Sequence, residues 1–423
     1  MAPQKTLQAF LAAARAALTA PASKRSTPLH FVVGNESADL DSLCSALLLA
    51  YLRSHEPPHT LHIPLCHIPR DDLALRPEFS AVLKHADAAV TSDDVLTLTE
   101  LPGDGDGLRP EDTRWLLVDH NAMTGALGQT YARRVVGCID HHDDEGKVPR
   151  DAVPRVVEKT GSCMSLVVAQ CAGAWDALAK AKDDDDDDME GRRINRGLGF
   201  LALAPILIDT SNLGNRDKTT ARDEHAVAVA EARILAAGSG SGSGEEEDYD
   251  RDRFFDEVSR LKEDISRMSI HDILRKDYKE WTTSEGDDGS GLRLGTSSAP
   301  QSFAFLVEKA GGEGAFVKEL EQWSAGKGLD VTVVLTTHKD DSGRFCRELL
   351  VWARTGPDVV EAVKKFVGGE GKEKLGLGTW GHGKLDEDDG EGSWRRCWTQ
   401  AKMENSRKQI APMLRDALKG VKT

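Results

Sequence analysis

The sequence predicts an α/β protein with two domains: an N-terminal parallel sheet flanked by helices, followed by a smaller α+β domain. Short segments that are apolar throughout alternate with helical patterns in the first half, as in parallel sheets that helices cover on both faces. A Gly-Ser run then interrupts the chain, and 423 residues exceed the length of one ordinary domain. These observations together favour two domains over one.

The expected domain boundary lies at residues 238–244, a Gly-Ser repeat that four acidic residues follow. This composition is typical of a flexible linker. We therefore expect a first domain over residues 1–235, a linker over 236–252 and a second domain over 253–423. A second biased stretch, Asp183–Asp188, is expected to be a solvated insertion, because adjacent carboxylates repel each other and lack the spacing of a calcium loop. No role for this run follows from the sequence.

The expected elements are as follows. The first part contains strands over Leu29–Val33, Trp115–Val118, Val135–Ile139 and Leu203–Ile208, and helices over Asp41–Leu52 and Gly161–Ala172. An earlier amphipathic helix places Leu7, Phe10, Leu11, Ala14 and Leu18 on one face. The second part contains a helix over Phe254–Leu274, strands over Ser302–Val307 and Val331–Thr336, and a helix over Pro357–Val367.

The composition excludes several classes of function. The chain has 54 Lys and Arg against 70 Asp and Glu, a net charge of −16, and no basic stripe of the kind that nucleic-acid-binding proteins carry. Its longest apolar stretch, Gly197–Ile208, is too short to cross a membrane. Seven scattered cysteines without a CxxC pair favour a reducing compartment. We expect a cytoplasmic monomer, with mitochondrial import as the alternative because no acidic residue precedes Glu36.

Acidic and imidazole side chains follow the ends of the four strands expected in the first part, where the ligand site of a parallel sheet lies. They are Asp39, Asp41, Asp119, Asp140, His141, His142 and Asp209. Converging carboxylates repel each other unless cations neutralise them. Mixed carboxylate and imidazole ligands suit Mn, Mg or Co, and two such ions can share carboxylates and activate water for in-line attack on phosphorus. The series predicts a two-metal site for phosphoryl chemistry.

Each piece alone has a structural alternative. Asp209 or Asp41 could cap a helix, and residues 119–121 could form an Asx-turn. Gly161–Ser162 precedes a helix whose amides could bind phosphate, or Ser162 could be the N-cap of that helix. Four such pieces in series, each at the end of an expected strand, favour a functional site.

Four motifs in the first part resemble those of the DHH phosphoesterase superfamily: Asn35-x3-Asp39-x-Asp41, Val118–Asn121, Ile139–His142 and Leu207–Asp209. Two later segments, Leu274–Lys279 and Asn405–Gln409, resemble the substrate-binding motifs of the DHHA2 domain. That domain occurs in family II inorganic pyrophosphatases and in eukaryotic exopolyphosphatases, including prune-type proteins.

Two positions are informative about the branch of the superfamily. Family II pyrophosphatases carry a histidine where this chain has Asn35, and prune-type proteins carry Asp-His-Arg where it has Asp140-His141-His142. The chain is therefore most similar to fungal-type cytosolic exopolyphosphatases.

The resemblance also implies residue roles. It assigns two divalent metal ions to Asp39, Asp41, Asp119, His141 and Asp209, with Asp119 and Asp209 as bridges. It assigns His142 to the phosphoryl group, Asn35 to a weak ligand or substrate contact, and Asp140 to a metal neighbour or an orienter of the histidines. Lys279, Arg407 and Lys408 would neutralise the terminal phosphates, and His338 and His382 could extend the chain-binding surface or be structural.

The implied activity is release of orthophosphate from the end of inorganic polyphosphate, with no nucleic-acid or membrane partner. The alternatives are a pyrophosphatase, an exonuclease or a nucleotide phosphohydrolase of the same superfamily, or a prune-like scaffold without catalysis. The segment Gly378–Gly383 resembles the Gly-rich motif of the exonucleases only superficially.

Overall fold

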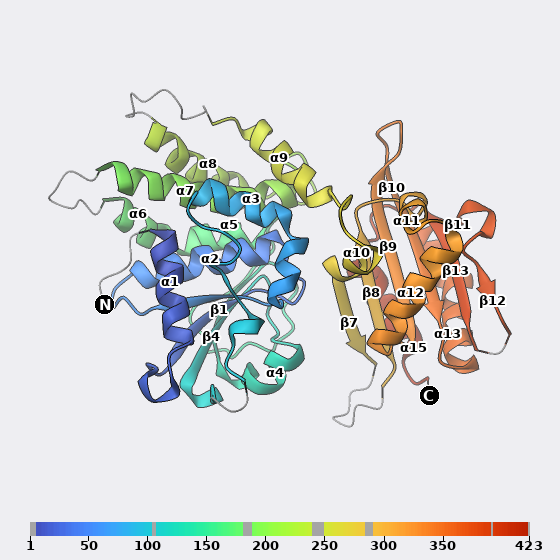
Figure 1. Ribbon diagram of the computed structural model, residues 1–423. Helices are drawn as coiled ribbons and strands as arrows, with labels where there is room; N and C mark the ends of the chain where they lie inside the picture. The colour runs from blue at the N-terminus through green and yellow to red at the C-terminus, as the bar shows by residue number, and fades with distance from the viewer. Residues whose placement is uncertain are drawn as a thin grey trace. The chain divides into compact units, whose positions relative to one another are not determined.

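The computed structural model describes residues 6–103, 107–180, 188–238, 249–283, 291–390 and 392–421. The chain divides into two compact units, Met1–Lys262 and Glu263–Thr423, and each contains its own sheet (Figure 1). Most of the predicted acidic insertion (183–187) and of the predicted linker (239–248) lies outside the described residues. No helix in the described part of the chain is both long and apolar enough to cross a membrane.

The first unit contains a six-stranded sheet in the order β3-β2-β1-β4-β5-β6, and all its pairings are parallel. Its strands are β1 (Leu29–Val33), β2 (His62–Cys66), β3 (Leu96–Thr97), β4 (Thr113–Val118), β5 (Val135–Asp140) and β6 (Arg155–Val157). The parallel sheet predicted from the sequence is thereby confirmed, and β1, β4 and β5 cover three of the four expected strands.

Helices pack on both faces of this sheet (Figure 1). They are α1 (Leu7–Leu18), α2 (Leu40–His55), α3 (Pro77–Ala86), α4 (Gly125–Tyr131), α5 (Cys163–Gln170), α6 (Ala172–Lys180), α7 (Asp188–Thr210), α8 (Ala221–Gly238) and α9 (Arg251–Glu263). Val32 of β1 belongs to the core that contains α2, α5, α7 and α8, whereas Phe31 belongs to the core on the other face. The strands are apolar throughout because both of their faces are buried. The five residues predicted to form the apolar face of the first helix are the buried residues of α1.

The strand predicted over Leu203–Ile208 is wrong, because these residues form part of α7. All residues from Leu201 to Leu207 are buried against neighbouring elements that include α2, α3, α5 and α8. A helix that is buried on all sides loses the alternation of apolar and polar residues, so its sequence cannot be told from a buried strand by periodicity. Gly197 allows α7 to approach α3, since a Cβ there would lie 1.8 Å from the carbonyl oxygen of Ala86.

The second unit is smaller and contains a seven-stranded mixed sheet in which only β8 and β9 pair in parallel. Its strands are β7 (Tyr278–Thr282), β8 (Arg293–Ala299), β9 (Val331–Lys339), β10 (Phe345–Ala353), β11 (Leu377–Thr379), β12 (Glu387–Asp388) and β13 (Trp394–Gln400). Helices α10 (Ile270–Lys276), α11 (Phe303–Ala310) and α12 (Glu313–Lys327) pack on one face, α13 (Pro357–Gly368) and α15 (Arg407–Leu418) pack on the other, and α14 (Glu370–Leu375) follows α13. This arrangement confirms the α+β class.

Two predictions for the second part are corrected. The single helix expected over Phe254–Leu274 is two helices, α9 and α10, because Ser269 begins a new helix with a capping box. The strand expected over Ser302–Val307 is the start of α11, with Ser302 as its N-cap. The expected strand at Val331 and the expected helix at Pro357 are confirmed by β9 and α13.

Candidate metal centre

Asp119 lies at the centre of an acidic cluster in the first unit. It directly follows β4, its φ is 62°, and its side chain is 3% exposed. Aspartate is one of the few residues that tolerate this left-handed conformation, which is enriched at functional sites. Oδ2 of Asp119 accepts hydrogen bonds from Ser42 Oγ at 2.7 Å and from Asn35 Nδ2 at 2.8 Å. Oδ1 lies 3.1 Å from Nε2 of His141.

The two histidines after β5 have different partners. Nδ1 of His141 lies 3.1 Å from the carbonyl oxygen of Thr160. A carbonyl only accepts, so Nδ1 carries the proton and Nε2 faces Asp119. Nδ1 of His142 lies 2.8 Å from Oδ1 of Asp140, a fully buried carboxylate. Such partners fix the orientation of an imidazole ring toward a metal or substrate.

Asp41 lies in the first turn of α2, and its carboxylate occupies the N-terminus of α5. Oδ2 accepts a hydrogen bond of 2.6 Å from the amide of Cys163, and Oδ1 accepts one of 3.0 Å from the amide of Met164. A helix N-terminus favours a negative charge, so these amides oppose the rise in the pKa of Asp41 that burial causes. The alternative in which Asp41 caps α2 is wrong. The N-cap of α2 is Asp39, whose Oδ1 accepts a hydrogen bond from the amide of Ser42.

Asp223 of α8 accepts hydrogen bonds from the two amides that precede α5. No sequence pattern indicates this role of Asp223. Its carboxylate accepts hydrogen bonds from the amides of Gly161 at 2.9 Å and Ser162 at 3.2 Å, and from Ser165 Oγ at 2.6 Å. Burial alone would raise the pKa of Asp223, but these bonds and those from Thr220 outweigh it and lower the pKa. Of the two alternatives for Gly161–Ser162, the structure shows Ser162 as the N-cap.

Asp209 belongs to the cluster and lies in the last turn of α7. The predicted position of Asp209 at the end of a strand is therefore wrong. Burial and the negative charge of Asp41 raise its pKa, which the nearby ammonium of Lys262 opposes. Burial and repulsion by Asp119 raise the pKa of Asp41 to about 6. The same carboxylates raise the pKa of His141 against the effect of burial. These groups therefore interact as one charged cluster, to which Asp39 also contributes.

The residues of this cluster fit divalent cations. Ligand atoms of Asp119, His141 and His142 lie within 4.8 Å of one another. Carboxylate oxygens and imidazole nitrogens suit Mn, Mg or Co, and a cation would remove the repulsion that raises the carboxylate pKa values. Two of the five residues predicted to bind metal, Asp119 and His141, belong to this group. The other three, Asp39, Asp41 and Asp209, interact electrostatically with it, and Asn35 donates a hydrogen bond to Asp119.

The two predicted substrate-binding segments of the second unit also meet. Nη1 of Arg407, the first residue of α15, donates to the carbonyl oxygen of Asp277 at 2.8 Å, and its Nη2 lies 2.7 Å from Asp277 Oδ1. Asp277 immediately precedes β7, whose second residue is Lys279. Lys408 follows Arg407 and is exposed. The three predicted cations therefore lie on two segments, and the contact between Arg407 and Asp277 connects these segments.

The two histidines that could extend the chain-binding surface, His338 and His382, lie elsewhere in the second unit. His338 of β9 pairs with Cys346 of β10, and its Nδ1 is buried without a hydrogen-bond partner among the described residues. His382 is exposed and has a φ of 55° in the turn Gly381–Gly383. Their contribution to substrate binding stays a prediction.

Comparison with known proteins identifies the family. Residues 30–194 match the N-terminal domain of the DHH family, and residues 256–417 match the DHHA2 domain. A Schizosaccharomyces pombe protein named "Putative exopolyphosphatase" is 31% identical to this chain, over 92% of the chain and 91% of that protein. The chain belongs to the DHH family. The predicted membership of this phosphoesterase superfamily, with a DHHA2 domain, is confirmed.

Other relatives extend the comparison of this DHH-family chain. Rattus norvegicus "Exopolyphosphatase PRUNE1" is 25% identical over 97% of the chain and 79% of that protein. The crystal structure titled "Methanococcus jannaschii putative family II inorganic pyrophosphatase" has a TM-score of 0.52 and 19% identity, and covers 92% of this chain and 99% of its own. At this identity the likeness shows the fold alone.

Two further side chains hold the loops of the DHH-family site. Arg76 is buried and donates through Nε to the carbonyl of Ala38 at 2.8 Å and through Nη2 to the carbonyl of Ser37 at 2.6 Å. Asn121 donates to Oδ2 of Asp140 at 2.5 Å. The motif Asp-His-Asn had indicated Asn121, whereas no local pattern indicates Arg76.

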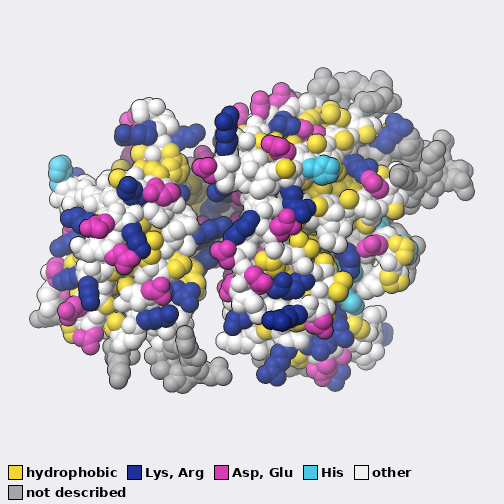
Figure 2. Space-filling model, turned by 180° about the vertical axis from the view of Figure 1, so that it is seen from behind, with side chains coloured by type: hydrophobic (Ala, Val, Ile, Leu, Met, Phe, Trp, Pro, Cys, Tyr) yellow, Lys and Arg dark blue, Asp and Glu magenta, His cyan; other side chains and the backbone are white. Residues whose placement is uncertain are grey.

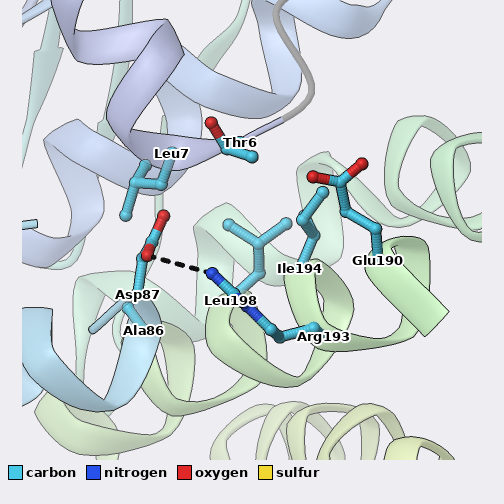
Figure 3. A pocket seen from close by; sticks show the side chains of 8 residues that line it. All are labelled: Thr6, Leu7, Ala86, Asp87, Glu190, Arg193, Ile194 and Leu198. Carbon is cyan, nitrogen blue, oxygen red and sulfur yellow. Dashed lines mark ion pairs between the residues drawn. The ribbon is translucent and has the colours of Figure 1, made fainter. Parts of the chain in front are cut away.

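A pocket of the first unit lies away from this cluster. It is lined by the start of α1, the end of α3 and the start of α7, where Arg193 pairs with Asp87 at 3.5 Å (Figure 3). None of the predicted site residues lines it. Acidic and basic side chains are interspersed over the face of each unit that Figure 2 shows.

Proposed function

We propose that this DHH-family hydrolase is a metal-dependent exopolyphosphatase that releases terminal orthophosphate from inorganic polyphosphate. The observation that carries the proposal is the cluster of Asp41, Asp119, His141 and Asp209, whose raised pKa values mark a site with excess negative charge. Such a site is suited to cations, and cations are what phosphoryl transfer requires. The name of the Schizosaccharomyces pombe relative supports polyphosphate as the substrate.

Asp39, Asp41, Asp119, His141 and Asp209 are the residues that would hold two divalent cations. When bound, these cations would supply a water of lowered pKa and neutralise phosphoryl oxygens. Helix α5 orients Asp41 and stabilises its ionised form through the amides of Cys163 and Met164. The carbonyl of Thr160 fixes the tautomer in which Nε2 of His141 faces Asp119.

His142 is the proposed contact to the phosphoryl group or to the leaving oxygen. Its Nδ1 lies 2.8 Å from Oδ1 of Asp140, which fixes the orientation of the ring. In the reaction, a water oxygen forms a bond to the terminal phosphorus, the bridging P–O bond breaks, and the shortened chain leaves as an anion. Hydrogen-bond donors and cations aimed at this leaving oxygen stabilise the developing charge.

Lys279, Arg407 and Lys408 are the proposed partners of the phosphates. A polyanion needs several cations in series, and Arg407 is pre-oriented by its two contacts with Asp277. Guanidinium and ammonium groups serve different purposes here, because only the planar fork binds two phosphoryl oxygens at once.

Phosphate release from long-chain polyphosphate, tripolyphosphate and pyrophosphate tests the proposal, each with Mg, Mn, Co or EDTA. We expect fast release from the long chain with a divalent metal, slow release from pyrophosphate, and no release in EDTA. Fast turnover of pyrophosphate with an inert long chain would contradict the assignment and favour a pyrophosphatase. No phosphate release from any of the three substrates would favour nucleotide substrates or a binding role without catalysis.

A further inference from the structure

Arg347 of β10 is a half-buried cation that forms no ion pair with any described acidic residue. Burial lowers the pKa of Arg347, and no neighbouring charge in the described part of the chain raises it again. Arg395 of the adjacent strand β13 is paired in the usual way, because its guanidinium lies 2.7 Å from the carboxylate of Glu387. Buried charges in proteins are normally paired, so a half-buried guanidinium without a carboxylate is a suitable partner for an anionic ligand.

The guanidinium of Arg347 is held in place by neutral groups. Nε donates to the carbonyl of Met403 at 2.8 Å, and Cζ lies 5.1 Å from the centre of the Phe345 ring. Phe345 is 43% exposed, so this end of β10 is open to solvent. The two Nη groups have no hydrogen-bond partner among the residues that the structure describes. Four N–H donors are therefore presented in one fixed orientation.

Met403 connects Arg347 to the predicted substrate-binding segments. Gln400, which pairs with Arg347 across β13 and β10, donates to the carbonyls of Lys402 at 2.7 Å and Asn405 at 2.6 Å. Side chains of paired residues lie on the same face of a sheet. The turn that Arg347 and Gln400 hold leads directly into Arg407.

We propose that Arg347 is a further phosphate-binding residue of the second unit, which extends the set formed by Lys279, Arg407 and Lys408 toward a longer polyanion. This inference rests on the proposed function for the identity of the substrate. The two outer nitrogens of the fork would donate to oxygens of the polyphosphate chain, and the bond from Nε to Met403 O would be kept. A substrate with only two phosphates has fewer groups to reach a fourth cation, so Arg347 favours long chains.

The matched test compares Arg347→Gln with Arg354→Gln in the full-length chain. Glutamine keeps a donor for Met403 but removes the charge and the fork. Arg354 follows the other end of β10 and pairs with Glu321 at 3.2 Å, so it reports the loss of an arginine that already has a partner. For Arg347→Gln we expect KM for long-chain polyphosphate to rise about three- to tenfold, with a smaller rise for tripolyphosphate and kcat within about twofold. Arg354→Gln should leave all three values unchanged.

Equilibrium binding of long-chain polyphosphate in EDTA separates this inference from the proposed function. A wild-type chain that hydrolyses polyphosphate, with an Arg347→Gln variant of unchanged KM and affinity, would overturn the inference and leave the function intact. A wild-type chain that binds polyphosphate without hydrolysis, with weaker binding by Arg347→Gln, would support the inference and overturn the function. Absence of both binding and hydrolysis would overturn both.

Arg347→Lys gives a second measurement if the glutamine variant melts below the assay temperature. Lysine keeps the charge and a donor for Met403, but it cannot donate two parallel hydrogen bonds. KM for the long chain should then rise by a smaller factor, with a melting temperature near that of the wild type. An unchanged KM in this variant would overturn the role of the fork.

Discussion

The side-chain amide of Asn35 donates a hydrogen bond of 2.8 Å to Oδ2 of Asp119. Its Oδ1 accepts from the amide of Ser37 at 2.9 Å, so both ends of the side chain are engaged. An amide in this position orients the carboxylate and adds no charge of its own. At the position where family II pyrophosphatases carry a histidine, this chain therefore has an asparagine that orients the carboxylate of Asp119 through a hydrogen bond.

Asn35→Ala tests that relationship. Removal of the donor leaves Ser42 as the remaining side-chain partner of Oδ2 of Asp119, so the carboxylate is less well oriented toward a metal. Loss of a residue that orients a metal ligand typically costs about 10- to 100-fold in metal affinity or activity. The concentration of Mg or Mn for half-maximal phosphate release should rise by about that factor, as a metal titration would measure. A titration curve identical to that of the wild type would contradict this role.

Asp140→Asn tests the orientation of His142. Burial alone would raise the pKa of Asp140, but hydrogen bonds from His142 and Asn121 outweigh it and lower the pKa to about 2. The amide that replaces it is a weaker acceptor, so kcat should fall about tenfold or more while the fold is kept. Asp143→Asn is the matched control, since that carboxylate is 96% exposed beside the same motif. Equal kcat values for the two variants would argue against an orienting role.

Asp223→Ala should destabilise the first unit. Its carboxylate is buried and accepts bonds from two amides at the start of α5, from Ser165 and from Thr220. Leaving buried donors unsatisfied costs about 2–4 kcal/mol in free energy of unfolding. Urea unfolding measures the loss, and the exposed Asp217→Ala in the loop before α8 should change stability by less than about 0.5 kcal/mol. Similar unfolding curves for both variants would refute the capping role.

Metal ions should stabilise the protein more at about pH 7.5 than at about pH 5.5. Burial and repulsion by Asp119 raise the pKa of Asp41 to about 6, above its usual value of 3.8. A carboxyl group with a raised folded pKa stabilises the fold while it is protonated, and this contribution is lost as the pH rises through the folded pKa. The metal-free protein therefore carries the largest repulsion above pH 6, where a metal ion does not have to displace a proton from Asp41.

The measurement is the difference in melting temperature between Mn and EDTA at the two pH values. The difference should be several degrees larger at the higher pH for a first unit of this size. A difference that is equal at both values, or larger at the lower one, would show that the cluster does not take up the metal in its ionised form.

Local patterns were sufficient for strands β1, β4, β5 and β9 and for most of the cluster. Asp119 and the histidines directly follow β4 and β5, so strand ends in a parallel sheet located them correctly. Asp209 was assigned to the cluster by its motif, but its element was wrong, because a helix buried on all sides has no polar face to reveal its period. The start of α11 does carry a helical signal in the sequence, since Ser302 is a good N-cap and Phe303 and Leu306 have helical spacing.

Long-range contacts set the limit of prediction from sequence. Asp223 binds the start of α5 from a distance of about sixty residues along the chain, and Arg76 reaches the loop before Asp39 from the start of α3. Neither residue belongs to a motif: Arg76 is the N-cap residue of α3 and makes no capping bond to it, and Asp223 lies in the first turn of α8. Their roles follow only when the tertiary fold brings their partners together.

The most direct test of a metal-dependent exopolyphosphatase is product analysis on long-chain polyphosphate. The chain and its Asp119→Asn variant would be incubated with Mg, and the products resolved by length on a gel over time. We expect orthophosphate as the product beside progressively consumed long chains, no release in EDTA, and near-complete loss of release in Asp119→Asn. Fragments of intermediate length without matching release of orthophosphate would contradict the account, because they indicate internal cleavage. Release that persists in EDTA or in the variant would contradict it as well.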